Sequence, residues 1–315
     1  MARLLIIFIL PFLIQAGPLT NKGRSCSVKL IADHLLYAHI YRKEGNKSDL
    51  DTESAIKSLF NSHINAVNKI YYRTNFSGIE KLNFYIEDIT IYNTDSCKNG
   101  KPVGQSGNPY CKTTISAADF LSIHSQRDYS KYCLAFIFTY RDFDHDELGL
   151  AWMANPSTKI PGGICQPTQK TFEGYQTLNT GIITLKHGWK KVDRRESELT
   201  FAHEIGHSLG AVHDTMEDAN YLMYPTAALD NPGQEVTFSP ASLENISHVL
   251  KRIVKSECLV EKPFSLQDYT EPQCKNGQSC DANKGYCDVN GECKPVKSEG
   301  PLIKFFKFVR NLDIF

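Results

Sequence analysis

One short run of residues constrains this chain more than any other feature. Residues 203–214 fit the pattern H-E-x-x-H-x-x-G-x-x-H-D. On a helix, His203 and His207 stand four residues apart, so both imidazoles project from the same face. Gly210 permits a turn after the helix, because glycine reaches backbone angles that other residues resist. That turn brings His213 towards the other two histidines.

Three histidines and a glutamate in this arrangement have the chemistry of a catalytic zinc site. Three neutral imidazoles leave one position of a tetrahedral Zn²⁺ open for water, and Glu204 lies beside that position as a general base. The alternative is a buried helix whose histidines bond only to backbone, but burying these four side chains without a metal is costly. We expect one zinc ion per chain, with His203, His207 and His213 as ligands and Glu204 as the catalytic residue.

A methionine after the motif makes the signal more specific. A bare H-E-x-x-H recurs by chance, whereas here residues 221–225 read Y-L-M-Y-P, with Met223 ten residues past His213. A glycine, a third histidine and a Met-turn after H-E-x-x-H form the metzincin signature. We expect Met223 to form a floor beneath the metal rather than a ligand, and Asp214 to be structural.

Composition and the N-terminal sequence limit the partners and the cellular location that this chain can have. The 315 residues carry no formal net charge, which excludes strong electrostatic steering towards nucleic acid. Residues 1–17 have a basic start, a short apolar run and a small residue at the exit, as in a secretory signal peptide. An uncleaved anchor is the alternative, although the run is short for a membrane span. We expect a secreted, extracellular protein.

The ten cysteines agree with that compartment. Their number is even and none has the C-x-x-C spacing of a zinc site, so disulfides are favoured. Proximity suggests that Cys97 pairs with Cys111 across a loop rich in Gly, Asn and Pro. Three N-x-[ST] sequons are candidate glycosylation sites; they start at Asn46, Asn75 and Asn245.

Hydrophobic periodicity predicts alternating helices and strands. Helices are expected at 51–72, 116–125, around the zinc motif and from Ser239-Pro240 onwards; strands are expected at 82–86, 89–91, 134–138, 148–153 and 180–185. This order predicts an α/β layered fold that is not doubly wound. The continuous apolar run 134–138 is typical of a central buried strand.

The chain changes character after Cys258. Residues 261–300 include Cys274, Cys280, Cys287 and Cys293, amid residues that cannot build a core without disulfides. The sequence does not choose among their three pairings. Residues 301–315 form a basic amphipathic helix, suited to a membrane surface or a protein groove. A helix that packs on its own protein is the alternative.

Several segments resemble the ADAM (reprolysin) branch of the metzincins, in its Kuzbanian or α-secretase type. Within the zinc motif, the resemblance rests on the aspartate that follows the third histidine. The other similar segments are D-H-L at 33–35, N-F-S-G-I at 75–79, L-G-L-A-W at 148–152, G-G-I-C at 162–165, L-N-T-G-I-I-T at 178–184 and T-F-A-H-E at 200–204. G-Y-C-D-V at 285–289 and G-P-L at 300–302 resemble the membrane-proximal end of such proteins and the stalk after it. The likeness covers roughly residues 26–260, and the chain departs from the family in lacking a prodomain, a disintegrin domain and a transmembrane segment.

The resemblance implies a metzincin-type catalytic domain over 18–260, with a mixed twisted sheet and helices. It implies the disulfides Cys26–Cys133 and Cys165–Cys258. It also implies that the substrate lies along an edge strand at Gly149, Leu150 and Ala151, with a pocket lined by Pro225, Thr226 and Ala227.

The expected function is therefore a secreted zinc metalloendopeptidase acting on extracellular proteins or membrane-protein ectodomains. Its partners would be protein or peptide substrates, with no nucleic acid. One alternative is an ADAM-like binding or decoy protein that acts through its C-terminal module. Another is a truncated product of a longer precursor.

Overall fold

The computed structural model describes residues 23–105, 107–157, 160–215, 221–225, 236–254 and 256–261, together with the backbone of three short strands near the C-terminus. The segment expected to be a signal peptide, Thr226, Ala227 and the tail 301–315 lie outside the described residues. In the described part of the chain, no helix combines the length and apolarity needed to cross a membrane.

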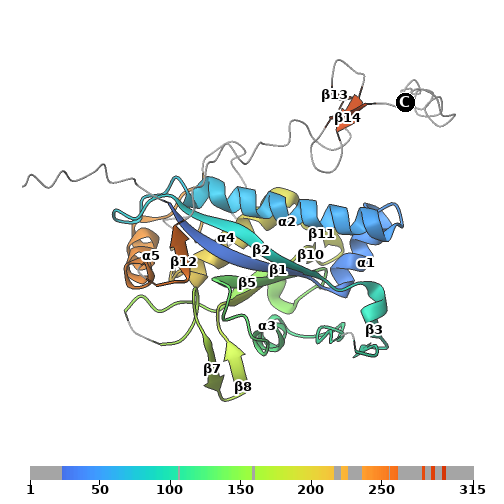
Figure 1. Ribbon diagram of the computed structural model, residues 1–315, viewed down its shortest axis with the longest axis horizontal. Helices are drawn as coiled ribbons and strands as arrows, with labels where there is room; N and C mark the ends of the chain where they lie inside the picture. Colours follow the sequence, from blue (N-terminus) through green and yellow to red (C-terminus); the bar gives the residue numbers. More distant parts are fainter. Residues whose placement is uncertain are drawn as a thin grey trace, which may run out of the picture.

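A six-stranded mixed sheet forms the centre of the domain (Figure 1). Its strands are β1 (Arg24–Ala32), β2 (Leu82–Ile91), β5 (Leu134–Thr139), β6 (Gly149–Ala151), β9 (Thr180–Thr184) and β12 (Leu259–Glu261). β2 and β5 lie parallel to β1 on its two sides, and β9 lies parallel to β5. β6 is antiparallel to β9, and β12 is antiparallel to β1. The expected mixed α/β fold is confirmed.

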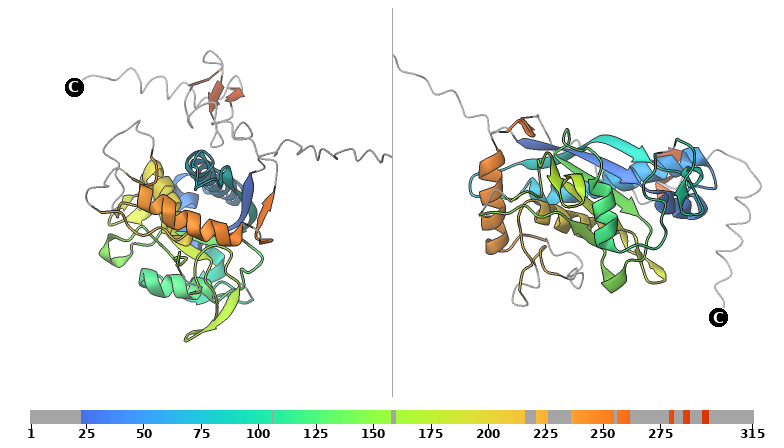
Figure 2. Two further views of the ribbon diagram at one scale, coloured as in Figure 1. Left: turned by 90° about the vertical axis from the view of Figure 1, so that its left-hand side faces the viewer. Right: turned by 90° about the horizontal axis from the view of Figure 1, so that it is seen from below.

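Five helices cover this sheet: α1 (His34–Lys43), α2 (Asp49–Tyr71), α3 (Ala117–Ser125), α4 (Arg194–Ser208) and α5 (Pro240–Ile253). In Figure 1, α2 runs along one face of the sheet and α3 lies on the other. Figure 2 shows α5 at one end of the domain, near β12. The helices expected at 51–72, 116–125 and after Ser239 all form, and Ser116 and Ser239 accept the N-cap hydrogen bonds of α3 and α5.

The central strand explains the continuous apolar run in the sequence. Leu134, Phe136 and Phe138 of β5 belong to the core that lies against α1, α2 and α4. Ala135 and Ile137 face the opposite way, into a second core with α3. Because both faces of β5 are covered by helices, every one of its side chains is buried and no polar alternation is possible.

Some elements differ from the sequence-based expectation. The strands expected at 82–86 and 89–91 are one strand, β2, whose register shifts opposite Val28 and Lys29 of β1. A β-bulge of this kind inserts an unpaired residue, here Glu87, and so interrupts the hydrophobic pattern. β1, α1 and β12 were not predicted, and β6 is shorter than the strand expected at 148–153.

Smaller elements decorate the domain. They are η1 (Thr94–Ser96), β3 (Cys97–Lys98), β4 (Lys101–Pro102), η2 (Asp144–Asp146), β7 (Thr168–Thr171), β8 (Gly174–Thr177), β10 (Lys186–His187) and β11 (Lys190–Lys191). The segment expected to be a cysteine-rich module contains a three-stranded antiparallel sheet of β13 (Ser279–Cys280), β14 (Gly285–Cys287) and β15 (Cys293–Pro295).

Three disulfides cross-link the domain that contains the six-stranded sheet: Cys26–Cys133, Cys97–Cys111 and Cys165–Cys258. These match the two pairings implied by the resemblance and the one suggested by proximity. Pairing of the last four cysteines lies outside the described side chains. Of the sequon asparagines, Asn46 and Asn75 are exposed, whereas Asn245 is half-buried on α5; their glycosylation stays a prediction.

A buried ion pair joins the end of β5 to the start of α1. The Asp33 carboxylate caps α1 by accepting hydrogen bonds from the Leu35 and Leu36 amides, at 3.1 and 2.9 Å. It also pairs with the Arg141 guanidinium, and both side chains are buried. Arg141 in turn donates to the Tyr110 carbonyl at 2.5 Å, which lies next to the Cys97–Cys111 disulfide.

We predict that Arg141→Met destabilises the fold strongly, because it leaves the Asp33 carboxylate buried without its cation. Removing one partner of a buried pair costs about 3–5 kcal/mol. Urea unfolding at pH 7 measures the loss. Lys57→Met is the matched control, since it removes an exposed pair with Glu53 worth about 0.3–0.5 kcal/mol. Equal losses in the two variants would contradict this role of Arg141.

Candidate metal centre

The three histidines of the motif converge on one point. His203 and His207 lie on α4, and His213 follows the turn after that helix. The Nε2 atoms of His203 and His207 are 3.0 Å apart, and those of His207 and His213 are 3.1 Å apart. All three ligand atoms lie within 4.8 Å of one another. The structure therefore brings together the three residues that the sequence spacing singled out.

Gly210 forms the turn that this convergence needs. Its φ of 95° lies in the left-handed region, where a side chain is strained. The Gly210 amide donates to the His207 carbonyl at 2.8 Å and the Ala211 amide to the Gly206 carbonyl at 3.0 Å. These bonds close the C-terminus of α4 and reverse the chain.

Backbone carbonyls fix the tautomers of two of the histidines. His203 Nδ1 lies 2.7 Å from the Leu222 carbonyl, and His207 Nδ1 lies 2.8 Å from the Ala211 carbonyl. A carbonyl only accepts hydrogen bonds, so each Nδ1 carries the proton and donates it. Both Nε2 atoms therefore present lone pairs to each other and to His213. No hydrogen bond satisfies two facing lone pairs, whereas a metal ion does.

The donor set fits zinc. Tetrahedral coordination at about 2.0–2.1 Å places ligand nitrogens about 3.3 Å apart, close to the separations measured here. Burial, together with the neighbouring imidazoles, lowers the pKa of His203 to about 3, and burial also lowers the pKa of His207. Both rings are thus neutral near pH 7, the form in which imidazole binds a metal.

Glu204 directly follows His203 on α4. Its side chain is buried, and Oε2 has no hydrogen-bond partner within the described part of the chain. Burial, with a further contribution from the charge of Glu147, raises the pKa of Glu204 to about 8. An unpartnered buried carboxyl is costly, so its retention here points to a ligand, water or substrate group that it would meet.

Gly149 makes room for that carboxyl, a contact that the sequence did not reveal. A Cβ atom at residue 149 would lie 2.7 Å from both Cγ and Oε1 of Glu204. The edge strand β6 therefore passes directly over the glutamate. A glycine within a strand pattern is the one sequence signal for such a close backbone approach.

Met223, the expected floor of the site, lies against the helix that carries His203 and His207. It is fully buried, and its sulfur packs against Gly206 of α4. Asp214 anchors this region: its amide donates to the Met223 carbonyl at 2.9 Å, and its carboxylate accepts from Ser239 and Ser242 at the start of α5. From the sequence, Ser239 was expected only as the cap of α5, and Ser242 was not singled out.

The expected substrate residues are placed only in part. Gly149, Leu150 and Ala151 form β6, and within the described sheet β6 pairs with β9 alone. Pro225 is exposed. Thr226 and Ala227 lie outside the described residues, so the pocket itself stays a prediction.

Comparison with known proteins agrees with this geometry. Residues 22–246 match the reprolysin group of Metallo-peptidase family M12. The chain belongs to this family. It is 40% identical over 308 aligned residues to "Disintegrin and metalloproteinase domain-containing protein 10 homolog" of Caenorhabditis elegans, an alignment that covers 88% of this chain and 33% of that protein.

A mammalian relative shows a similar level of identity and coverage. "Disintegrin and metalloproteinase domain-containing protein 10" of Mus musculus is 32% identical over 285 aligned residues, which cover 86% of this chain and 35% of the relative. The chain thus spans about a third of the length of these relatives. The ADAM-type resemblance is confirmed, and membership of an M12 metallo-peptidase family implies a catalytic metal.

The raised pKa of Glu204 gives a pH prediction for the metal-free chain. Between its ordinary pKa of 4.5 and about 8, the unfolded chain has lost this proton and the folded chain retains it. Stability therefore falls as pH rises through that interval. For chelator-treated protein, we expect Glu204→Gln to remove a pH dependence on the order of a few kcal/mol.

Urea unfolding at pH 5 and pH 8 measures this difference. Glu196→Gln is the control, because Glu196 lies in the first turn of the same helix and its side chain is only half-buried. The same pH dependence in wild type and Glu204→Gln would show that the Glu204 carboxyl is not held protonated.

Proposed function

We propose that this chain is a secreted zinc metalloendopeptidase that hydrolyses peptide bonds in extracellular proteins or membrane-protein ectodomains. The observation that carries the proposal is the convergence of three imidazole nitrogens at the end of the helix that carries Glu204, whose buried Oε2 has no hydrogen-bond partner among the described residues. Family membership supports the reaction class, and the disulfides and the signal-like N-terminus support secretion.

In the proposed site, His203, His207 and His213 hold the zinc ion. Zinc bound there supplies Lewis acidity and lowers the pKa of a bound water to about 7. Glu204 takes a proton from the attacking water and passes it to the leaving amine nitrogen. The backbone of β6 at Gly149 lies against the buried Glu204 carboxyl, and burial strengthens its electrostatic interaction with charge that develops nearby.

The substrate would bind in an extended form along β6. The outer edge of Gly149–Ala151 offers backbone donors and acceptors for β-augmentation. Residues 225–227 would line the pocket on the side of the departing amine. A substrate bound in this way would have its scissile carbonyl next to Glu204, because β6 crosses the glutamate at Gly149.

The domain assignment is also part of the proposal. Residues 1–17 would be a signal peptide, 18–260 the catalytic domain, 261–300 a small cysteine-rich module and 301–315 a basic tail for a membrane or protein surface. The described sheet of the catalytic domain ends with β12 at Glu261, which supports the boundary near residue 260.

We predict that Glu204→Gln keeps zinc but loses peptidase activity by roughly 10²–10⁴-fold, because the proton acceptor is gone while the ligands stay. Metal content by mass spectrometry and cleavage of a fluorogenic peptide measure the two properties. Glu198→Gln on the same helix is the control and should retain activity. A chelator should abolish wild-type cleavage, and added zinc should restore it.

Two outcomes would count against the proposal. A Glu204→Gln protein that cleaves at near the wild-type rate would remove the glutamate from the mechanism. A zinc-loaded wild-type protein without activity on any of a broad set of peptides would favour the binding or decoy alternative.

A second variant tests the fit between β6 and the base. Gly149→Ala places a methyl group 2.7 Å from Glu204 Oε1, so the carboxyl must shift. We predict at least about a tenfold loss of kcat, since small displacements of a catalytic group cost up to 10²-fold, with zinc content unchanged. Ala151→Gly in the same strand is the control. Normal kcat in Gly149→Ala would mean that the base does not rely on this contact.

A further inference from the structure

Four cysteines gather where two strands meet end to end on one side of β1. β12 pairs with the first part of β1, with Leu259 opposite Cys26. β5 pairs with the later part of the same side, with Leu134 opposite Val28. Between them, the Cys133 amide donates to the Ser27 carbonyl at 3.0 Å. Cys258 and Cys133 therefore approach β1 from opposite directions and meet beside Ser27.

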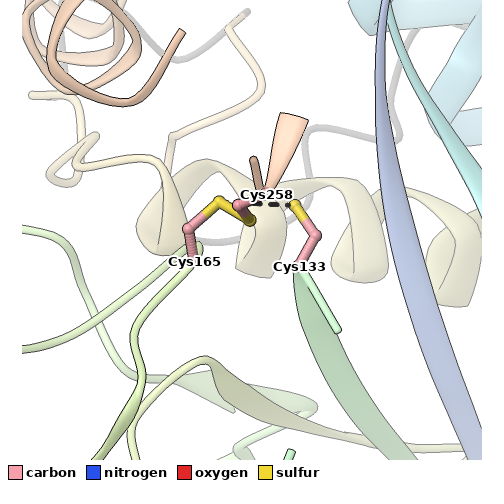
Figure 3. A group of neighbouring side chains, drawn as sticks. All are labelled: Cys133, Cys165 and Cys258. Carbon is pink, nitrogen blue, oxygen red and sulfur yellow. Dashed lines mark hydrogen bonds between the residues drawn. A yellow bond between two sulfur atoms is a disulfide. The ribbon is translucent and has the colours of Figure 1, made fainter. Parts of the chain in front are cut away.

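Two disulfides are in contact at this junction. Cys26 is bonded to Cys133, and Cys165 is bonded to Cys258. Figure 3 shows Cys133 next to the second disulfide, and the Sγ atoms of Cys133 and Cys165 are 3.8 Å apart. The sulfurs of Cys133, Cys165 and Cys258 all lie within 4.8 Å of one another. No backbone rearrangement is needed to bring the two bonds into reach.

An external thiol does not reach the two disulfides equally well. Cys26 and Cys133 are 0% and 1% exposed, whereas Cys165 and Cys258 are half-buried. Exchange requires a thiolate to reach a disulfide sulfur, so a reductant meets the Cys165–Cys258 bond first. The inner bond is then reached from within the protein, by the cysteine that the first step releases.

We propose that this junction is a thiol–disulfide relay that converts Cys26–Cys133 and Cys165–Cys258 into a single Cys133–Cys165 bond. An external dithiol attacks Cys258, forms a mixed disulfide and releases the Cys165 thiolate. That thiolate attacks Cys133, the Cys133–Cys165 bond forms, and Cys26 leaves as a thiolate that takes up a proton. The second thiol of the reductant then displaces Cys258, so the dithiol is oxidised and two protein thiols are produced.

The relay changes the two sides of the junction differently. The loop that carries Cys165 stays joined to β5, and its Ile164 amide still donates to the Ser208 carbonyl at the end of α4, at 2.7 Å. Cys258 loses its disulfide to the loop that carries Cys165. β12 is then held to β1 by three residue pairs and by the half-exposed Arg24–Glu261 ion pair. The relay therefore releases the chain that follows β12 and leaves the histidine site braced.

Linkage mapping after limited reduction tests the proposal on the full chain. The protein is treated with substoichiometric dithiothreitol, quenched with acid and alkylated, and its disulfide-linked peptides are identified by mass spectrometry. We expect a Cys133–Cys165 linked peptide, with Cys26 and Cys258 alkylated to equal extent. Alkylation of Cys165 and Cys258 with Cys26–Cys133 intact would overturn the relay, as would a Cys133–Cys258 link. The readout needs no peptidase activity, so it is independent of the proposed function.

A variant that traps the product provides a second test. Cys26→Ser with Cys258→Ser should form the Cys133–Cys165 bond without added reductant and should retain zinc. Amide hydrogen exchange at residues 259–261 should be at least about tenfold faster than in wild type, because a disulfide at Cys258 no longer restricts the opening of β12. Cys97→Ser with Cys111→Ser removes a distant disulfide and should leave that exchange rate unchanged. Free thiols at Cys133 and Cys165 in the folded trap variant would refute the relay.

Discussion

The site depends on two backbone carbonyls, those of Leu222 and Ala211. Each accepts the Nδ1 proton of a motif histidine, so that the Nε2 lone pairs of His203 and His207 face a common point. Both carbonyls come from the chain beyond α4: one from the turn after Gly210 and the other from the segment that carries Met223. The ligand geometry therefore requires that α4 end where it does and that the chain return beneath it.

The rest of the domain holds that returning chain in place. Asp214 links the segment around Met223 to the first turn of α5. On the other side, Ala154 donates to the His207 carbonyl at 3.2 Å, and the neighbouring Cys165 amide donates to the Cys133 carbonyl at 3.0 Å. The end of the histidine helix is thus tied to α5 and to the central strand β5. The disulfides Cys26–Cys133 and Cys165–Cys258 also cross-link this part of the structure.

The sequence predicted those parts of the structure that local patterns determine. The helices α2 and α3, the buried strand β5 and the three converging histidines follow from periodicity, capping residues and motif spacing. β1 and β12 did not follow, because β12 is only three residues long and is a strand only through pairing with β1. The carbonyl partners of the histidines were equally hidden, since a backbone oxygen carries no residue identity. The pairing Cys165–Cys258 came from resemblance, because 93 residues separate its members.

Gly149 links the two parts of the proposed chemistry, which are substrate binding along β6 and proton transfer by Glu204. A carboxyl base beside a metal is useful only if the substrate carbonyl arrives within its reach, and here the strand that would guide the substrate is the strand that touches the base. A larger residue at position 149 would separate β6 from the Glu204 carboxyl by the thickness of a side chain. Burial of Glu204 under β6 is unfavourable for the folded chain by itself, since it raises the pKa of the carboxyl to about 8. A cation beside it would reverse that effect by favouring the ionised form. In the proposed site, metal binding would therefore also favour the ionised form of Glu204 that accepts a proton.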